Sequence, residues 1–369
     1  MWMSLPFEKC IQKVNTPFKL PKKEYLEHGR YPVVSQEAAL ISGYHNDPNH
    51  LFNVDEPVVI FGDHTQVLKY IDFSFVVGAD GVKILKPIEE IDPKYLYYTL
   101  LMLMPKGSGY ARHYRLLKEL NICYPSLAEQ QRIVAKLDEA FAEIDTVVEI
   151  ENKKSSALDL LERNFLEQVF STSHPVIKVG DLGEVKSGGT PKSTNASYWN
   201  GDIPWYSSGE LNNLFTSPSE KFITVDGLNN SNAKLFPKGS LLVGMYDTAA
   251  MKMSILQEEA TFNQAIVGIP PNQFASAEYL FYAMKFLKPT ILLERRGVRQ
   301  QNLSLAKIKE IEIPLPTRDV QHKIVERLRE LGRQQSSYHH SLIQKREKYL
   351  LLKSAILAQE LQPQRSEAA

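Results

Sequence analysis

Two short stretches of the sequence carry the side chains that a nucleic-acid-binding surface needs, and each lies shortly before a long amphipathic segment. The stretch in the second half comprises Arg295, Arg296, Arg299, Gln300, Gln301 and Asn302, and the one in the first half comprises Lys106, Arg112, His113 and Arg115. Cationic groups neutralise phosphates, while guanidinium and amide groups form paired hydrogen bonds to base edges. A solvated polar loop is the alternative interpretation, but the equivalent placement in both halves favours contact with DNA.

Further polar side chains are expected on loops of the same surface. In the second half these are Ser207, Ser208, Tyr246, Asp247, Thr248, Asn263 and Gln264, and in the first half they are Ser35, Gln36, Asp63, His64 and Thr65. Asp63, His64 and Asp247 follow apolar runs in matching places, where a metal or acid–base role competes with a simple hydrogen bond within the loop. We favour the hydrogen bond and expect no metal site.

The sequence lacks the motifs of the catalytic classes that act on DNA bases or nucleotides. An adenine methyltransferase needs a short Asn/Asp-Pro-Pro-aromatic loop that grips the flipped base, together with a glycine-rich cofactor loop. The stretch "NTPF" at 15–18 is one residue from the first motif, but no βαβ pattern or glycine-rich G-x-G partner accompanies it. We therefore assign Pro17 and Phe18 to a turn and to packing. A phosphate-binding G-x-x-x-x-G-K-[ST] is also missing from the sequence, so we predict a chain that is not an enzyme.

Composition sets wide limits on the class of protein. The 369 residues are enough for two or three domains, and 43% hydrophobic with 23% charged residues is typical of a folded, soluble protein. Basic and acidic residues balance at 43 each, which argues mildly against a nucleic-acid binder, although a neutral total can hide a basic face. Neither a signal peptide nor a membrane-spanning run is apparent, and Cys10 and Cys123 suit neither a metal site nor a disulfide framework. We expect a cytoplasmic protein with reduced thiols and no membrane association.

The chain contains an internal repeat. A shift of 191 residues aligns 116–170 with 307–361 without a gap. Under this shift Pro125 falls on Pro316, Gln130 falls on Gln321, and the pair Leu160-Leu161 falls on Leu351-Leu352. Unrelated helices can have leucines at the same helical spacing. They rarely also share a proline, a glutamine and a matching C-terminal end at one fixed offset. Duplication is therefore the better explanation.

Each copy of the repeat predicts one long helix. A proline precedes it, and apolar residues then follow a heptad pattern that continues for over 30 residues in both copies. No proline or glycine interrupts 126–170, whereas Gly332 in the second copy costs about 1 kcal/mol against alanine. A stripe this narrow needs another helix against it, so an amphipathic helix on a globular core is the weaker alternative. We expect the two copies to pair antiparallel as an intramolecular coiled coil with a pseudo-two-fold axis.

Two polar positions in the predicted seam indicate its register. Glu151 and Lys345 have opposite charges, and an antiparallel register in which paired residue numbers sum to 496 places them opposite each other. A charge pair within a seam tends to fix the register more than it adds stability. We therefore expect these two side chains to lie within one helical turn of each other.

The segments that precede the helices also match each other weakly. "GRYPVVSQ" (29–36) resembles "GDIPWYSS" (201–208), "VVIFGDHT" (58–65) resembles "LLVGMYDT" (241–248), and "YLYYTL" (95–100) resembles "YLFYAM" (279–284). The second pair predicts short buried strands, and the third predicts helices capped by Asp92 or Ser276. Both segments are therefore expected to be mixed α+β domains whose differences concentrate in their loops.

The stretch "SGGTPKSTNASYWNGDIPWYSSGEL" (187–211) resembles the signature that opens a target-recognition domain in the specificity subunits of type I restriction–modification systems. The starts of both long helices and the ending "SAILAQELQP" are similar to the spacer helices of that family. The first half lacks the Gly-Gly-Thr-Pro and the tryptophan block, so its assignment depends on the helix repeat and on "YPVVS". Within the block, Tyr198, Trp199 and Trp205 could stack on bases, but mainly we expect them to pack under loops.

The resemblance implies an α+β chain with two target-recognition domains joined by two long antiparallel spacer helices. The expected boundaries are 1–122 for the first recognition domain, 123–173 for the first spacer helix, 174–313 for the second domain and 314–369 for the second helix. Each domain would read half of a bipartite, asymmetric site in double-stranded DNA, and the helices would set the spacing and dock two methyltransferase subunits. A restriction subunit is a further partner in such systems. No cofactor is expected on this chain, since S-adenosylmethionine, ATP and magnesium belong to the partner subunits.

A structural adaptor is the alternative function. In that hypothesis the paired globular modules on a coiled coil bind proteins and never bind DNA. Salt-sensitive, sequence-selective DNA binding in the presence of a methyltransferase partner distinguishes the two hypotheses.

Overall fold

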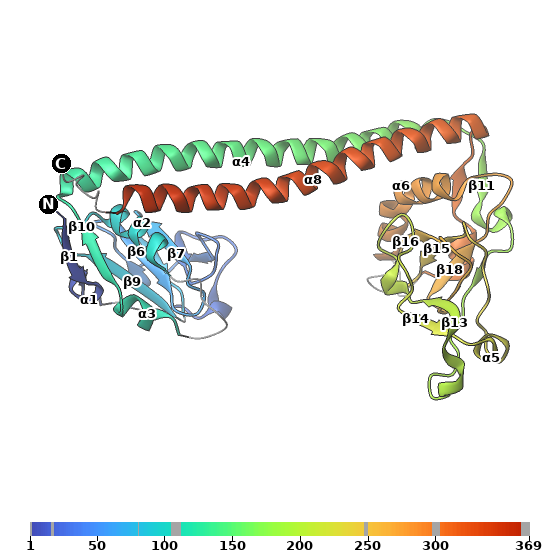
Figure 1. The fold of residues 1–369 in the computed structure, drawn as a ribbon, viewed down its shortest axis with the longest axis horizontal. Coiled ribbons are helices and arrows are strands. Elements are labelled where there is room, and N and C mark those ends of the chain that lie inside the picture. The colour runs from blue at the N-terminus through green and yellow to red at the C-terminus, as the bar shows by residue number, and fades with distance from the viewer. Residues whose placement is uncertain are drawn as a thin grey trace, which may run out of the picture. The chain divides into compact units, whose positions relative to one another are not determined.

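The computed structural model describes residues 2–15, 18–79, 81–104, 112–246, 250–296 and 303–362. The chain divides into two compact units, one made of Met1–Glu151 with Leu342–Ala369 and the other of Asn152–Ser341. Each unit contains a mixed α+β domain and a part of each of two long helices, α4 (Leu127–Phe170) and α8 (Arg318–Glu360) (Figure 1). The fold class predicted from the sequence is therefore confirmed.

The described part of the first domain is built from short strands and three short helices. One four-stranded sheet has the order β2 (Ile11–Gln12), β9 (Val82–Pro87), β6 (Val58–Gly62), β7 (Leu68–Ile71), and a second has the order β4 (Gly43–His45), β3 (Tyr31–Val34), β8 (Phe75–Val77), β5 (Leu51–Phe52). Strand β1 (Met3–Pro6) pairs with β10 (Asn121–Tyr124). The helices are α1 (Phe7–Cys10), α2 (Pro93–Leu103) and α3 (Tyr114–Lys118), with 3-10 turns η1 (Lys22–Glu24) and η2 (Pro48–His50).

The second domain repeats this plan. Strands β12 (Lys186–Ser187), β18 (Ile266–Ile269), β15 (Leu241–Gly244) and β16 (Met253–Ile255) form one sheet, β14 (Lys221–Ile223), β13 (Trp199–Tyr206) and β17 (Thr261–Phe262) form another, and β11 (Val176–Lys178) pairs with β19 (Glu312–Pro314). The helices are α5 (Val225–Asn229), α6 (Ala277–Arg296) and α7 (Leu305–Lys309). The 3-10 turns are η3 (Val179–Leu182), η4 (Ala196–Tyr198) and η5 (Ser208–Glu210).

Local sequence explains the elements at the centre of each domain. Strands β6 and β15 are buried at every residue, which is why their sequences are uninterrupted apolar runs. Helix α2 begins after Asp92, whose carboxylate accepts hydrogen bonds from the backbone amides of Lys94 and Tyr95, both at 2.9 Å. In α6 the hydroxyl of Ser276 accepts the corresponding bond from Tyr279 at 3.2 Å. Both predicted caps are therefore confirmed.

The internal repeat is visible in individual contacts. The side-chain nitrogen Nε2 of Gln130 donates to the carbonyl of Pro125 at 2.9 Å, and Nε2 of Gln321 donates to the carbonyl of Pro316 at 3.0 Å. Both glutamines are buried, so each uses its amide to satisfy backbone groups where a domain meets its long helix. This requirement explains why the glutamine and the proline are repeated at the 191-residue offset.

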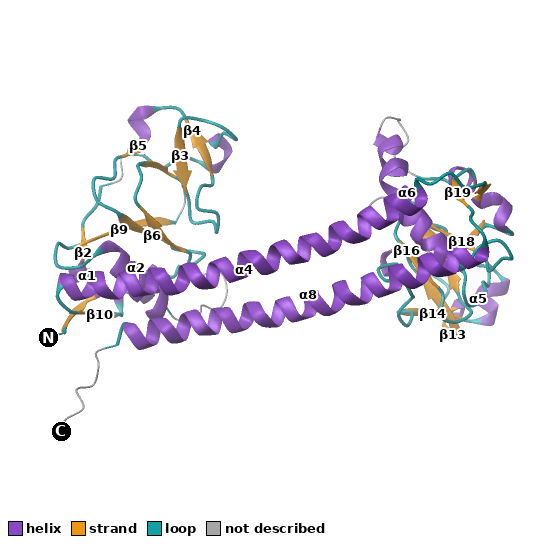
Figure 2. Cartoon of the chain, turned by 90° about the horizontal axis from the view of Figure 1, so that it is seen from above, coloured by secondary structure: helices purple, strands orange, loops and turns teal. Residues whose placement is uncertain are grey.

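The two long helices run antiparallel and side by side (Figures 1 and 2). In the first unit, Lys136 of α4 pairs with Glu360 of α8 at 3.1 Å, and Asp145 pairs with Lys353 at 2.6 Å. In the second unit, the hydroxyl of Ser155 is 2.8 Å from Nε2 of His339. Residue numbers rise along α4 as they fall along α8, which confirms the predicted direction.

Candidate nucleic-acid interface

In the first domain, predicted contact residues from distant parts of the chain meet where β3 and β6 end. The amide of His64 donates to Oε1 of Gln36 at 3.1 Å, and the hydroxyl of Thr65 donates to the carbonyl of Gln36 at 2.6 Å. Gly81 packs closely against the same side chains. A Cβ at this position would lie 2.8 Å from Oε1 of Gln36 and 2.9 Å from the His64 ring, so the close approach requires glycine. Thr65 is exposed, and Gln36 and His64 are half-buried. The structure thus brings three predicted residues into one loop cluster.

Asp63 connects this cluster to the stretch that precedes α3. Its carbonyl accepts a hydrogen bond from the amide of His113 at 2.7 Å, and its carboxylate accepts one from the amide of Tyr114 at 2.8 Å. The carboxylate also lies 4.0 Å from the ammonium of Lys83. The predicted loop hydrogen bond of Asp63 is therefore confirmed. Because the carbonyl and the carboxylate of Asp63 both bond to the segment at the start of α3, we assign this residue a role in positioning the loops.

Lys69 is a supporting residue that sequence reasoning missed. Its ammonium donates to the carbonyls of Ser35 at 2.8 Å and Ala39 at 2.5 Å, and burial lowers its pKa. The hydroxyl of Ser35 lies 2.7 Å from that of Ser42, so both ends of the β3–β4 loop are fixed. A lysine in an alternating strand such as "LKYI" looks solvent-facing, and only the tertiary structure reveals its role.

Burial separates the predicted residues of this domain into two groups. Ser35 and His113 are 3% and 6% exposed, so they support the loops and do not present their side chains. Arg112 and Arg115 are exposed just before and within α3, where their guanidinium groups can reach a phosphate. Lys106 lies outside the described residues.

The second domain has the same arrangement of backbone bonds. The backbone amide of Met245 donates to the carbonyl of Ala265 at 2.9 Å, and the carbonyl of Met245 accepts from the amide of Leu303 at 3.1 Å. In the first domain the amide of Asp63 donates to the carbonyl of Gly81 at 2.7 Å, and the carbonyl of Asp63 accepts from the amide of His113. Asp63 therefore corresponds to Met245. The sequence alignment of 58–65 with 241–248 placed it opposite Tyr246 and is wrong by one residue. The error arose because the alignment matched similar residues in the loops, whereas the backbone hydrogen bonds show which residues end the strands.

Three predicted residues of the second domain form side-chain or capping hydrogen bonds in the loops near these strand ends. Ser207 caps η5 in a reciprocal pair with Glu210, whose carboxylate accepts from the Ser207 amide at 2.6 Å. Asn263 accepts from the Ala265 amide at 3.0 Å, and Oε1 of Gln264 accepts from the hydroxyl of Thr190 at 2.5 Å. Gln264 is exposed, and its amide nitrogen is the group with which it can read a base edge.

The remaining predicted residues of this domain are partly described. Ser208 lies in η5 and is half-buried, and Tyr246 is 36% exposed. The backbone of Arg295 and Arg296 forms the last residues of α6. The described residues do not include Asp247, Thr248, Arg299, Gln300, Gln301 and Asn302.

The glycine–glycine motif has a structural reason. A Cβ on Gly188 would lie 2.1 Å from the carbonyl oxygen of Phe262, and one on Gly189 would lie 2.2 Å from the backbone of Asn232. Trp205 is 6% exposed and donates from its indole to the carbonyl of Gly189 at 3.0 Å. The predicted packing of Trp205 is confirmed, so the motif builds the scaffold beneath the loops.

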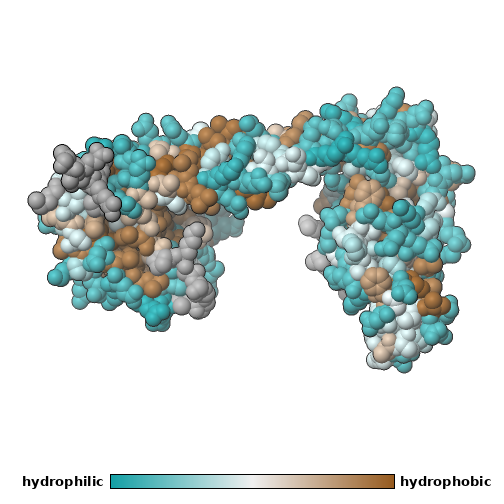
Figure 3. Space-filling model, viewed as in Figure 1, coloured by the Kyte–Doolittle hydropathy of each residue, from teal (hydrophilic) through white to brown (hydrophobic). Residues whose placement is uncertain are grey.

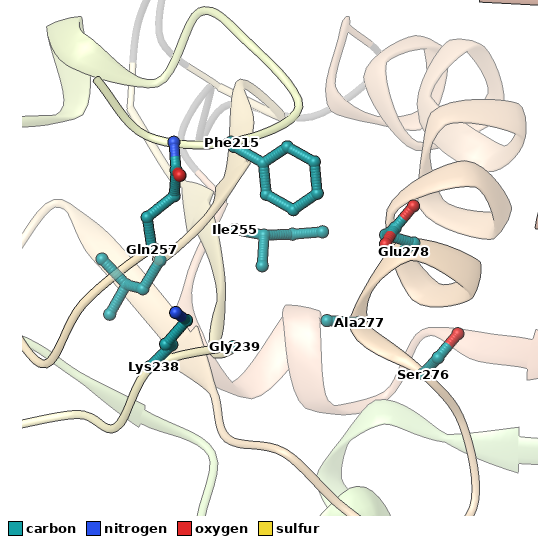
Figure 4. A pocket seen from close by; sticks show the side chains of 9 residues that line it. Phe215, Lys238, Gly239, Ile255, Gln257, Ser276, Ala277 and Glu278 are labelled. Atoms are coloured by element: carbon teal, nitrogen blue, oxygen red, sulfur yellow. The ribbon is translucent and has the colours of Figure 1, made fainter. Parts of the chain in front are cut away.

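A pocket elsewhere in the second unit shares no residue with these loops. Figure 4 shows it between Phe215, Ile255 and the start of α6, with the carboxylate of Glu278 at its edge. The side chain of Glu278 forms a two-pronged ion pair with Arg329 of α8. Because this ion pair takes up the carboxylate of Glu278, that group is not a free acid or base, and we assign the pocket no chemistry.

Comparison with solved structures defines the class of fold. A chain from a structure concerned with complex assembly and conformational transition of a type I restriction–modification system has a TM-score of 0.73 to this chain at 16% identity, covering 99% of this chain and 98% of that one. The HsdS subunit from Thermoanaerobacter tengcongensis has a TM-score of 0.54 at 17% identity, covering 98% and 96%. At these identities the likeness concerns the fold.

Sequence comparison gives the family. The model of the type I restriction modification DNA specificity domain matches residues 10–158 and 174–348, so the chain belongs to this family of specificity subunits. The Escherichia coli EcoR124I/EcoR124II specificity subunit is 25% identical over 84% of this chain and 81% of its own length. The Methanocaldococcus jannaschii MjaIX specificity subunit is 32% identical over 47% of this chain and 39% of its own length. Among the described residues, no helix is long and apolar enough to cross a membrane.

Proposed function

We propose that each domain of this specificity subunit reads one half of a bipartite, asymmetric site in double-stranded DNA. The observation that carries the proposal is the repeated loop cluster: both domains place polar side chains at equivalent strand ends, fixed by equivalent backbone bonds. Exposed Thr65 and Arg115 in the first domain, and exposed Gln264 in the second, offer the hydroxyl, guanidinium and amide groups that DNA recognition uses. The two domains differ in these loops, which fits an asymmetric target.

The long helices are proposed to set the spacing and to dock two methyltransferase subunits. Leu160 and Leu161 of α4 are 52% and 53% exposed, and Leu351 and Leu352 of α8, which lie 191 positions further on, are 67% and 47% exposed. Figure 3 shows apolar residues, in brown, on the surface of the helix pair. Exposed leucine pairs are costly in water and mark binding surfaces. A surface that occurs once in each repeat fits two copies of the same partner.

Catalysis is proposed to belong to the partners. The chain selects the DNA sequence, while methyltransferase subunits bind S-adenosylmethionine, and any restriction subunit binds ATP and magnesium. The loop clusters support this division of roles, because the carboxylate of Asp63 is used in loop hydrogen bonds. We place the assembled enzyme in the cytoplasm, where its DNA substrate lies.

Binding and methylation by the complex with its methyltransferase test the DNA proposal. The complex should bind one bipartite sequence selectively, and its affinity should fall steeply with salt, because phosphate contacts release counterions. Arg299→Ala should weaken binding by about 1–3 kcal/mol and relax one position of one half-site if this arginine contacts a guanine. Binding that ignores both sequence and salt would favour the adaptor hypothesis.

Substitutions in the leucine pairs test the docking surface. Leu351→Glu with Leu352→Glu should remove one methyltransferase subunit from the complex, and adding Leu160→Glu with Leu161→Glu should remove the second. Leu293→Glu is the matched control, because this leucine is 64% exposed but belongs to α6 and to neither of the two long helices. Native mass spectrometry gives the subunit count. Two bound methyltransferases in the fourfold variant would contradict this docking site.

A further inference from the structure

Two histidines and an aspartate of the first domain form a compact cluster outside the DNA-reading loops. Nε2 of His45 lies 2.9 Å from Nδ1 of His50, and the other ring nitrogen of His50, Nε2, lies 3.8 Å from the carboxylate of Asp47. The ligand atoms of the three residues lie within 4.8 Å of one another, and all three are partly buried. His45 pairs with Tyr31 at the start of β3, whereas the reading loop follows β3 at its other end.

The arrangement of nitrogens matches a metal centre with an orienting carboxylate. A tetrahedral zinc ion with two imidazole ligands requires a nitrogen–nitrogen separation of about 3.3 Å, so a small ring movement from 2.9 Å admits the ion. Metal-bound histidines commonly direct their second ring nitrogen at a carboxylate, which fixes the tautomer and the ring orientation. The carboxylate of Asp47 lies on that side of His50, 3.8 Å from Nε2, and it also accepts hydrogen bonds from the backbone and side-chain nitrogens of Asn49 at 2.9 Å. The ring of Phe18 stacks on His50 at 3.7 Å and restricts its rotation.

The position of the cluster gives a bound ion a structural task. His45 ends β4 and His50 immediately precedes β5, and these are the two edge strands of one sheet. The segment between them therefore crosses from one edge of the sheet to the other. Among the described residues, the small core on this face of the sheet has Leu20, Val33 and Val76 as its fully buried members, whereas Val34, Phe75 and Val77 of the same sheet belong to a larger core shared with β6 and β7. An ion shared by the two histidines would fasten the crossing segment at both ends.

We propose that His45 and His50 bind a borderline divalent ion of the Zn²⁺ class, with Asp47 orienting the His50 ring and water completing the coordination. Imidazole ligands select Zn²⁺, Ni²⁺ or Cu²⁺, whereas Mg²⁺ and Ca²⁺ prefer oxygen ligands. The ion stabilises the β4–β5 crossing of the first domain. This site takes no part in the chemistry of methylation and is independent of the proposed DNA contacts. No metal site was expected from the sequence.

Calorimetric titration of the metal-stripped full chain with ZnCl₂ at neutral pH, in excess MgCl₂, tests the proposal. The wild-type chain should bind one more equivalent of zinc than His45→Gln or His50→Gln. Asp47→Asn should keep the site but weaken it by about 10–100-fold, as expected for the loss of an orienting carboxylate. His28→Gln is the matched control, since His28 is an exposed histidine of the same domain, and it should behave as the wild type.

Thermal unfolding supplies a second measurement that covers variants with altered stability. Zinc should raise the melting temperature of the wild type and of His28→Gln, and it should leave those of His45→Gln and His50→Gln unchanged. Equal zinc stoichiometry in all variants would place the ion elsewhere and overturn the proposal. The absence of zinc binding by the wild type at micromolar concentrations would overturn it as well.

Discussion

The ammonium of Lys345 lies 2.8 Å from the carboxylate of Glu151, in the seam between α8 and α4. Their numbers sum to 496, so the register predicted from the sequence is confirmed, and the Lys136–Glu360 pair has the same sum. The Glu151 side chain is 10% exposed and that of Lys345 is 41% exposed. The hydrogen bond to Glu151 raises the pKa of Lys345, which therefore stays charged at neutral pH. The pair specifies one register, because a slip would leave the nearly buried carboxylate without its cation.

Reversal of this charge pair should show that the register is specific. Glu151→Lys and Lys345→Glu should each lower the melting temperature, because each sets two like charges together in the seam. The double variant restores opposite charges and should recover most of the loss. Calorimetric unfolding of the four proteins measures the coupling. If the double variant loses as much as both single variants together, the pair does not determine the register.

The parts of the fold that repeat in the sequence could be predicted. Pro125, Gln130 and the heptad pattern fixed the long helices, because their roles in capping and packing depend on local spacing. The loops could not be predicted with the same accuracy, since their structure depends on tertiary contacts. The match of Asp63 with Tyr246 was wrong by one residue for this reason. Lys69 gave no local sign that its ammonium is directed into the β3–β4 loop.

Gly332 should be a removable weak point of α8. A Cβ at this position would meet no atom within 4 Å, so alanine fits without strain. Gly332→Ala should therefore stabilise the chain by up to about 1 kcal/mol, through the higher helix propensity of alanine. Gly188→Ala is the matched control and should destabilise by about 1–3 kcal/mol, because the new Cβ meets the Phe262 carbonyl. Chemical denaturation measures both changes, and a less stable Gly332→Ala would show that the helix requires glycine there.

Lys69 should act as a positioning residue for the first half-site. Lys69→Met removes the donor to Ser35 and Ala39 and leaves two carbonyls without it, at a cost of about 1–3 kcal/mol. The loosened loop should relax the first half of the methylated sequence and leave the second half unchanged. Lys23→Met is the control, because Lys23 is exposed on η1 of the same domain. Methylome sequencing reports both halves, and an unaltered first half in a folded Lys69→Met protein would remove this residue from recognition.

The central claim is that the two domains read DNA separately, and an exchange of the second domain tests it most directly. The two domains have separate hydrophobic cores, and groups without shared contacts act almost independently. Residues 174–306 should be replaced by the corresponding segment of another specificity subunit, with the first domain and both long helices kept. Methylome sequencing of cells that express this hybrid with its methyltransferase should show one half of the methylated sequence changed, with the other half and the spacing retained. A simultaneous change of both halves in a hybrid that still assembles and methylates would contradict the account.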